Sequence, residues 1–423
     1  RSDSGVIPLA VMMKPYPCPG QCIYCPQEAG MPKSYFSDEP AAARAKSQNF
    51  DPVNQIRFRL RQLKLTGHTT SKIELIVIGG TYSAYPKAYK LEFIKSLYDT
   101  CNGIKSSSVE AAQKLNASAK RRIVGLSIET RPDWITPEEV VLLRRLGVTK
   151  VQLGVQALDA GILKKIHRGH SLEATTQATR LLRNAGLKIC YHFMPNLPGS
   201  SLEKDLEMAK MMYTDPRFIP DSVKIYPCAV IPGTPLEDLY RIGKFESYPD
   251  ARLISLLIKI KLLTPPTVRI DRLVRDISKK WIVSGTLFSN MRQMIQAKMK
   301  RDGLVCRCIR CREIKGGSFA RPTLLRFDYD TLGGREIFLS YEKDSQLFSL
   351  LRLRLPLLDS PPLFPELVRA AIIREVHTFG TTVGVTSRDV TKTQHRGLGK
   401  SLMEEAEQIA KTAHYHKIAV ISA

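Results

Sequence analysis

The sequence predicts an α/β protein in which a partial (β/α)6 barrel is followed by a smaller α/β domain. Short apolar runs alternate with amphipathic helical stretches up to about residue 262, which is typical of a parallel sheet with crossover helices. A second strand-rich pattern starts near residue 322, after a basic stretch that contains cysteines. A chain of 423 residues also exceeds the size of one ordinary core. We therefore expect a barrel at 1–262, a small cysteine-rich linker at 263–321 and a second domain at 322–423.

Six apolar runs predict the strands of the barrel, and they lie at 6–12, 73–78, 123–128, 151–155, 189–193 and 223–226. Amphipathic stretches predict helices at 90–98, 137–146, 172–185 and 202–212. A conspicuous polar or glycine-rich motif follows each strand. Because barrel enzymes carry their active sites at the carboxyl ends of the strands, we expect these loops to face one cavity.

The second domain is predicted from strands at 335–341, 346–353 and 367–379, a helix at 398–413 and a last strand at 418–421. Its length of about a hundred residues is ordinary for a domain.

The net charge is the most unusual feature of the composition. Lys and Arg total 64 against 40 acidic residues, which gives +24. Such a surplus favours polyanionic partners such as RNA, DNA or an anionic membrane surface. No apolar run approaches the roughly 18 residues of a spanning helix, which disfavours a membrane protein. Most of the nine cysteines cluster at metal-ligand spacing rather than as a disulfide framework, which predicts a reducing, cytoplasmic location.

Cys18, Cys22 and Cys25 lie in the loop KPYPCPGQCIYCP, directly after the first predicted strand. Thiolates are the usual ligands of iron–sulfur clusters, and three of them would leave one iron of a four-iron cluster open. The alternative, a small zinc knuckle, is disfavoured because a closed zinc site needs a fourth ligand and none lies nearby. The spacing resembles the signature of the radical S-adenosylmethionine (SAM) superfamily, whose open iron chelates the amino and carboxylate groups of SAM.

This resemblance implies a SAM pocket formed by the loops after the other strands. Seven residues of these loops are candidates for it: Gly79, Gly80, Thr81, Glu129, Arg131, Gln156 and Lys224. The glycine loop would present backbone groups to the SAM amine, while Glu129 and Arg131 would bind the ribose and the carboxylate. The alternative for each motif is a plain turn or a surface ion pair. The nearby KKIHRGH motif, with His167, Arg168 and His170, is interpreted first as a basic surface loop.

The second cysteine cluster consists of Cys306, Cys308 and Cys311, between the two predicted domains. It suits zinc or an auxiliary iron–sulfur cluster. Zinc, as a structural clip, is favoured because nothing near it looks like a substrate cavity. The fourth ligand is open among water, a distant cysteine and a histidine. The three isolated cysteines are expected to be small buried residues: Cys101, Cys190 and Cys228.

Residues 252–315 form a basic window, with sixteen Lys and Arg against four acidic residues. One interpretation is a solvated helical face. The favoured interpretation is a wall that contacts nucleic-acid phosphates, given the charge of the whole chain. Its candidate residues are Arg269, Arg272, Arg275, Lys279 and Lys280.

A glycine-rich motif lies between a predicted strand and the helix at 398–413. It consists of Gln394, His395, Arg396, Gly397, Leu398, Gly399 and Lys400. Glycines allow a phosphate to approach the backbone, and a helix N-terminus offers free N–H groups to it. The motif resembles the coenzyme A pyrophosphate loop of the GNAT acetyltransferases. A simple turn is the alternative.

Together these motifs resemble the catalytic subunit of Elongator and its single-chain bacterial and archaeal relatives. The resemblance rests on CPGQCIYCP, KIELIVIGGTY, IETRPD, GVQ, RGH, KIYP, VRDI, FLSYE, SRD and QHRGLGKSLMEEAE. It implies a radical SAM barrel joined to a GNAT domain. It also implies an acyltransferase that adds a carboxymethyl group to carbon-5 of the wobble uridine of tRNA. The cofactors would be a [4Fe-4S] cluster, SAM, acetyl-CoA and zinc, with a 5′-deoxyadenosyl radical taking hydrogen from the acetyl methyl group.

The implied partner is the tRNA anticodon stem-loop, with a homodimer or other Elongator-type subunits as further expectations. The resemblance also implies a segment with paired tyrosines beyond Ala423, so the C-terminal end of the GNAT domain is expected to be missing from this chain. Two other functions stay open: a protein lysine acetyltransferase with a structural cluster, and a tRNA-binding scaffold. No individual catalytic residue is assigned.

Overall fold

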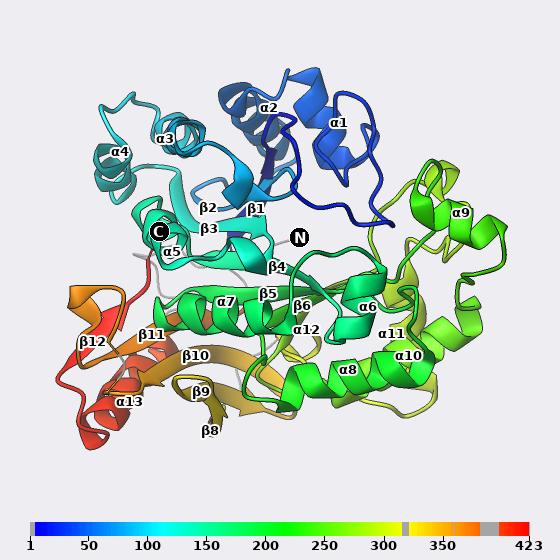
Figure 1. The fold of residues 1–423 in the computed structure, drawn as a ribbon. Helices are drawn as coiled ribbons and strands as arrows, with labels where there is room; N and C mark the ends of the chain where they lie inside the picture. Colours follow the sequence, from blue (N-terminus) through cyan, green and yellow to red (C-terminus); the bar gives the residue numbers. More distant parts are fainter. Residues whose placement is uncertain (1–4, 315–320, 360, 381–396, 423) are drawn as a thin grey trace.

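The computed structural model describes residues 5–314, 321–359, 361–380 and 397–422, which form two β-sheets with helices packed around them (Figure 1). None of the helices in these ranges is long and apolar enough to span a membrane.

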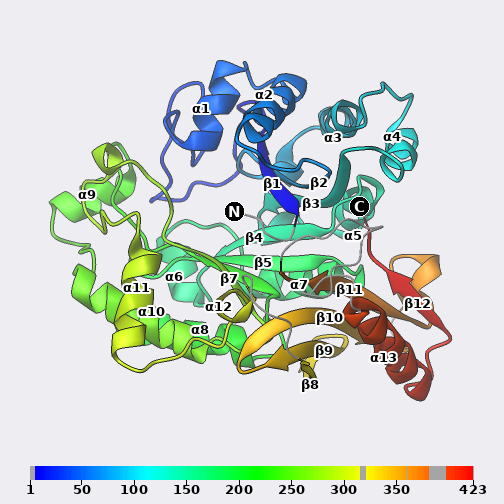
Figure 2. The same cartoon turned by 180° about the vertical axis from the view of Figure 1, so that it is seen from behind.

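The larger sheet contains seven strands, and their order in space is their order in the sequence. Its strands are β1 (Val6–Met12), β2 (Lys72–Ile78), β3 (Arg122–Thr130), β4 (Lys150–Gln156), β5 (Lys188–Phe193), β6 (Ser222–Ile225) and β7 (Arg269–Leu273). Every neighbouring pair is parallel. Parallel strands in unbroken order have crossovers of one hand, which place the connecting helices on one face. The sheet therefore curls into an open barrel with its helices outside (Figures 1 and 2).

Six of these strands were predicted, and the count was wrong by one because β7 was missed. Only Ile270 and Leu273 of this strand are buried, and polar residues occupy the other positions. The segment therefore lacks an apolar run and was assigned to the basic window instead.

Twelve helices of the described chain surround or extend the larger sheet. They are α1 (Pro40–Ser47), α2 (Pro52–Leu65), α3 (Lys87–Asn102), α4 (Val109–Asn116), α5 (Pro137–Arg145), α6 (Ala160–Lys165), α7 (Leu172–Asn184), α8 (Leu202–Thr214), α9 (Pro235–Arg241), α10 (Asp250–Leu263), α11 (Met291–Arg301) and α12 (Ile309–Arg312). Several begin at a side-chain cap, as where Thr136, Asp159, Ser171 and Ser201 accept a hydrogen bond from a backbone N–H of the first turn.

The main hydrophobic core extends beyond residue 262, where the sequence analysis ended the barrel. Met291, Ile295 and Met299 of α11 belong to this core, and so do Cys306 and Cys308. Together with β7, these residues place most of the predicted linker inside the barrel domain.

The second sheet has the order β12-β11-β10-β9-β8. Its elements are β8 (Thr323–Thr331), β9 (Gly334–Lys343), β10 (Gln346–Pro356), β11 (Ala370–Thr378), the helix α13 (Leu398–Thr412) and β12 (Lys417–Val420). β8 was not predicted, because most of its residues are exposed and it lacks a buried apolar run. All pairs are antiparallel except β11 with β12. The parallel pairing ends at Ile373 and Val420, so β11 continues past its partner toward Thr378.

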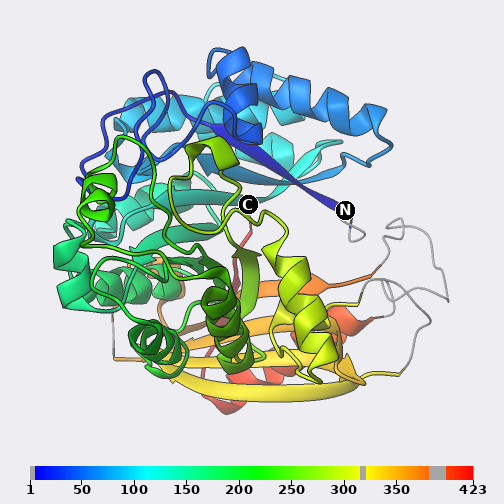
Figure 3. The ribbon, with the colours of Figure 1, turned by 90° about the vertical axis from the view of Figure 1, so that its right-hand side faces the viewer.

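The two faces of the second sheet have different chemistry, as the alternation of side chains along a strand requires. Ile337, Leu353 and Ile373 pack with α13 in one apolar cluster. Their neighbours Glu336 and Arg374 point the other way, toward the barrel. Figure 3 shows the second sheet (yellow to orange) lying against the barrel.

A buried ion network joins the two sheets. Arg374 Nη2 lies 2.5 Å from Asp221 Oδ1, beside β6, and 2.9 Å from Glu336 Oε2. Arg354 Nη1 pairs with Glu336 Oε1 at 2.9 Å, and Lys188 of β5 pairs with Glu375 at 3.1 Å. Paired in this way, the charges tolerate burial and fix the orientation of one sheet on the other.

Candidate active site

The cysteine loop leaves the carboxyl end of β1 and is held by distant parts of the barrel. The Ile23 N–H donates to the carbonyl of Ile166 (3.2 Å), and the Ile23 carbonyl accepts from the N–H of Leu236 (3.0 Å). Lys33 Nζ donates to the carbonyl of Gly20 at 2.6 Å. Contacts from three different parts of the sequence therefore shape the loop.

The three thiols of this loop suit a multi-iron cluster better than a single ion. Among the described residues, only Cys306, Cys308 and Cys311 form a set of ligand atoms that all lie within 4.8 Å of one another. Cys18, Cys22 and Cys25 are spread more widely, as thiolates must be when each binds a different iron. Burial and then the neighbouring Cys22 raise the pKa of the Cys25 thiol to about 11. A bound metal would therefore be needed to hold this thiol as a thiolate.

Arg168 and His170 are buried whereas His167 is exposed, so the interpretation of the KKIHRGH motif as a surface loop was wrong for two of these three residues. Arg168 is only 5% exposed, and its Nη1 donates to Cys22 Sγ at 3.5 Å. Its Nε and Nη2 donate to the carbonyl of Gly154 at 3.2 and 2.5 Å. Burial, and then the charge of Arg168, lower the pKa of His170 to about 3, so this ring is neutral.

Arg131 lies beside the same loop, and one nitrogen of its guanidinium has no hydrogen-bond partner among the described residues. Its Nε and Nη2 form a bidentate pair with Asp133 at 2.9 and 2.8 Å. The remaining Nη1 is buried without a hydrogen-bond partner in the described chain. Gly20 lies so close to this nitrogen that a side chain there would collide with it. A buried donor without a partner, next to three thiols, is suited to a carboxylate of a bound ligand.

Glu129 is the centre of a second cluster at the end of β3. Its carboxylate accepts hydrogen bonds from Tyr35 Oη (2.6 Å) and Lys224 Nζ (3.2 Å), and His192 Nε2 lies 4.0 Å away. Burial opposes the charge, but Lys224, His192 and Tyr35 outweigh it and lower the pKa of Glu129 to about 2. Burial, and then Lys224, lower the pKa of His192 to about 3. The pocket therefore contains a carboxylate, an ammonium and a neutral imidazole.

The other predicted loops lie at the same edge of the sheet. Thr81 Oγ1 is 3.6 Å from Cys18 Sγ, which places the Gly79-Gly80-Thr81 turn against the cysteine loop. Gly80 adopts a φ of 92°, a conformation that favours glycine. Gln156 ends β4 with its buried Oε1 lacking a partner in the described ranges.

Tyr35 and His192 are site residues that the sequence analysis missed. His192 lies in β5 two residues after Cys190, and a polar side chain at alternate positions of an apolar strand indicates a lining of the barrel interior. Tyr35 follows the cysteine loop in an irregular stretch, and no local pattern distinguishes it.

The second cysteine cluster is compact and mostly buried. Its three sulfur atoms lie within 4.8 Å of one another, which suits one ion. Lys261 of α10, fully buried, donates from Nζ to Cys311 Sγ at 3.5 Å. Hydrogen bonds from Cys306 and Cys308, and then Lys261, lower the pKa of Cys311. Lys261 was not among the expected partners of this site.

The predicted coenzyme A motif is described only in part, because Gln394, His395 and Arg396 lie outside the described residues. Gly397 precedes α13 with a φ of 82°, and Leu398, Gly399 and Lys400 form the first turn of this helix. The Gly399 Cα faces the end of β11, where an added Cβ would meet Thr378 Oγ1 at 3.8 Å. The helix N-terminus therefore lies beside the extended end of β11.

The five candidate tRNA residues do not form one wall. Arg269 begins β7 and pairs with Asp271 and Glu313, at the edge of the sheet away from the cysteine loop. Arg275 follows β7 at the opposite edge, where it binds Ser34 and Glu39 and lies over the ring of Tyr35. The three-residue spacing of the arginines predicted one common surface. In the structure, Arg269 and Arg275 lie at opposite ends of β7 and bind carboxylates of the protein itself. The more exposed members are Arg272, Lys279 and Lys280.

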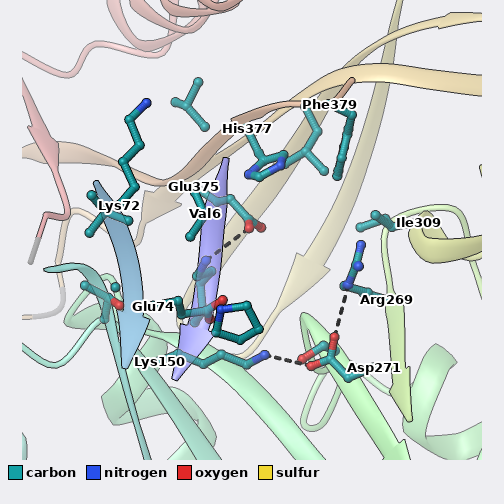
Figure 4. A pocket seen from close by; sticks show the side chains of 18 of the residues that line it. Val6, Lys72, Glu74, Lys150, Arg269, Asp271, Ile309, Glu375, His377 and Phe379 are labelled. Carbon is teal, nitrogen blue, oxygen red and sulfur yellow. Dashed lines mark hydrogen bonds and ion pairs between the residues drawn. The ribbon is translucent and has the colours of Figure 1, made fainter. Parts of the chain in front are cut away.

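A cavity of about 1080 Å³ lies at the amino edge of the larger sheet, opposite the cysteine loop (Figure 4). It is enclosed by the first residues of the seven strands and by the facing ends of β10 and β11. Lys150 and Asp271 pair across its floor at 2.7 Å, and Glu375 and His377 line the side of the second sheet. The cavity therefore lies between the two domains.

Two family models match this chain. Residues 16–212 match the radical SAM superfamily, and residues 220–301 match the radical SAM C-terminal domain. The second match covers β7 and α11, in agreement with their packing on the barrel.

Relatives match along nearly the whole chain. The tRNA uridine(34) acetyltransferase of Dehalococcoides mccartyi is 45% identical over 97% of this chain and 91% of its own length. Human Elongator complex protein 3 is 38% identical over 100% of this chain and 81% of its own length. The solved structure of Methanocaldococcus infernus Elp3 with an N-terminal deletion covers 99% of this chain and 94% of that chain, with 41% identity and a TM-score of 0.86.

Proposed function

The chain belongs to the family of Elongator complex protein 3 and the tRNA uridine(34) acetyltransferases, and from this premise we propose that it adds a carboxymethyl group to carbon-5 of the wobble uridine of tRNA. The substrates would be tRNA and acetyl-CoA, and the reaction would depend on SAM.

The convergence of loops at the carboxyl edge of the larger sheet carries this proposal. Cys18, Cys22 and Cys25 would hold a four-iron cluster, and the free Nη1 of Arg131 would bind the carboxylate of SAM. A cluster with SAM supplies radical chemistry, which the protein itself cannot perform. This chemistry suits the acceptor, because carbon-5 of uracil is a poor electrophile for an acetyl enolate.

The cluster around Glu129 would bind the ribose of SAM. Its carboxylate stays ionised at neutral pH, because the charge of Lys224 and the hydrogen bonds from Lys224 and Tyr35 lower its pKa. An oriented carboxylate accepts hydrogen bonds from ribose hydroxyls without first having to reorganise. Gly79, Gly80, Thr81 and Gln156 would complete the pocket.

The acetyl donor would bind at the start of α13. The N–H groups of Leu398, Gly399 and Lys400 belong to the first turn of a helix, where N–H groups have no partner within the helix and can bind a pyrophosphate. Gln394, His395 and Arg396 belong to the same motif and remain part of the proposal.

The tRNA would approach the exposed cations after β7. Lys279 and Lys280 are exposed, and Trp281 next to them stacks on Phe36, which follows the cysteine loop. Cations that bind the backbone of an anticodon stem-loop there would bring an unpaired base near the SAM pocket.

Three finer assignments complete the proposal. Zinc would occupy the Cys306, Cys308 and Cys311 site as a structural clip. A homodimer or Elongator-type subunits would be protein partners, and the location would be cytoplasmic, as unpaired cysteines of this spacing suggest.

Anaerobic reconstitution with iron and sulfide tests the proposal. With SAM, acetyl-CoA, tRNA and a reductant, the protein should produce 5′-deoxyadenosine. Cys22→Ser should abolish this product, whereas Cys101→Ser, which changes a buried cysteine of α3, should retain it. SAM cleavage at the wild-type rate by Cys22→Ser would contradict the proposal.

A further inference from the structure

Gly154 of the GVQ motif and Arg168 of the RGH motif have no role in the proposed function, yet the structure brings them together. Arg168 of the RGH motif donates twice to the carbonyl of Gly154, the first residue of the GVQ motif. A Cβ on Gly154 would lie 2.6 Å from Arg168 Nη2, which is closer than real carbon atoms approach. Glycine at this position therefore makes room for the guanidinium.

The two bonds to Gly154 use Nε and Nη2 of Arg168 and leave Nη1 for the cysteine loop. Nη1 points to Cys22 Sγ at 3.5 Å. Two residues earlier, the carbonyl of Ile166 accepts the N–H of Ile23. The segment from Ile166 to Arg168 therefore binds both the side chain of Cys22 and the backbone of the next residue.

The charge of Arg168 has no carboxylate partner among the described residues. The nearby carboxylate of Asp133 is engaged by Arg131 in a bidentate pair. His170, the neighbouring titratable ring, is neutral. A buried cation is stable only when an anion compensates it, and besides the neutral carbonyl of Gly154 the group to which Arg168 donates is the sulfur of Cys22.

We propose that Arg168 is a positioning residue that orients the Cys22 thiolate and raises the reduction potential of the cluster bound at Cys18, Cys22 and Cys25. This inference rests on the cluster assignment of the proposed function. A cation that donates to a ligand sulfur stabilises the reduced state, because reduction adds negative charge to the cluster. Gly154 is then the residue that fixes the guanidinium in place.

The midpoint potential of the reconstituted cluster tests this role. Arg168→Gln removes the charge and should shift the equilibrium between the oxidised and reduced cluster at least tenfold toward the oxidised form. For a one-electron couple this corresponds to a potential lower by about 59 mV. Arg168→Lys keeps the charge, but lysine cannot reach both Gly154 and Cys22. The cluster potential of this variant should therefore lie between those of the wild type and Arg168→Gln.

Gly154→Ala offers a second variant, because it moves the guanidinium of Arg168 away from Cys22 without removing its positive charge. It should lower the potential in the same direction by a smaller amount. Arg145→Gln, on the exposed face of α5, is the matched control and should leave the potential unchanged. Electron paramagnetic resonance and iron and sulfide analysis confirm in each case that the same cluster is present.

The outcomes separate this inference from the proposed function. A wild-type protein that assembles no iron–sulfur cluster contradicts the proposed function. A fully loaded Arg168→Gln protein with the wild-type potential contradicts the role of Arg168 alone. If Arg168→Gln folds but retains no iron, the midpoint potential of the Gly154→Ala protein tests the inference instead. A potential equal to that of the wild type would overturn it.

Discussion

Glu129 keeps its negative charge although it is buried, because Lys224 and Tyr35 compensate for its burial. Tyr35 and Lys224 donate to its carboxylate, and His192 lies at 4.0 Å. The position after the third strand indicated a functional carboxylate, but the sequence could not identify these partners. They come from β5, β6 and a loop, and only the curvature of the sheet brings them together.

Glu129→Gln should destabilise the protein by about 3–5 kcal/mol at pH 7, because it leaves the charge of Lys224 buried without its partner. Denaturant unfolding measures this loss. The surface variant Glu110→Gln breaks the exposed pair with Arg145 and should cost less than about 1 kcal/mol. Equal losses in the two variants would contradict the assigned role of the Glu129 pocket.

The same pocket predicts a pH dependence. The pKa of Glu129 is about 2 in the folded protein and 4.5 ordinarily. Its contribution is therefore complete above pH 4.5 and is lost as the pH falls toward 2. The stability difference between the wild type and Glu129→Gln should shrink over this range. A constant difference from pH 5 to pH 3 would contradict the lowered pKa.

At the level of elements, apolar runs in the sequence predicted the first six strands of the larger sheet. They failed for β7, whose inward-facing Asp271 pairs with Lys150 of β4 at 2.7 Å. This pair lies 121 residues apart in the sequence, so no local pattern could reveal that the charged position faces the barrel interior. The predicted arginine wall failed for the same reason, because Arg269 and Arg275 bind carboxylates from other elements.

Ile270→Ala tests whether β7 belongs to the barrel core. Ile270 is fully buried in the main hydrophobic core, so its truncation should cost about 2–5 kcal/mol. Arg272→Ala, two residues along the same strand, should change stability by less than about 0.5 kcal/mol, because its side chain is 41% exposed. Thermal or denaturant unfolding compares the two. A loss of stability in Ile270→Ala as small as that in Arg272→Ala would contradict the assignment of β7 to the barrel core.

At the scale of the whole molecule, a network of buried charges joins the two sheets, beside apolar contacts of Leu363, Phe364 and Ile421 with the barrel core. The polar face of the second sheet turns Arg352, Arg354 and Arg374 toward Asp221 and Glu336. The sequence predicted two domains but not this interface, because a buried arginine and a surface arginine have the same signature. The network fixes the cavity between the domains, and it therefore also fixes the position of the second sheet relative to the proposed SAM pocket.

The net charge of +24 leads to a salt-dependent affinity for tRNA. The double variant Lys279→Ala and Lys280→Ala should reduce the slope of log affinity against log salt by about 0.7–0.9 for each phosphate that the protein no longer neutralises. Arg335→Ala, on an exposed position of β9, is the control and should leave the slope unchanged. Filter binding between low and moderate salt measures both. An unchanged slope in the double variant would remove these lysines from the tRNA surface.

The central claim is that this chain joins the acetyl group of acetyl-CoA to uridine at the wobble position. Mass analysis of nucleosides, after anaerobic incubation of the reconstituted protein with tRNA, SAM and acetyl-CoA labelled in both acetyl carbons, tests it most directly. The account predicts 5-carboxymethyluridine that carries both labelled carbons and disappears in Cys22→Ser. Unmodified uridine together with labelled acetyl-lysine in protein, unaffected by Cys22→Ser, would contradict it.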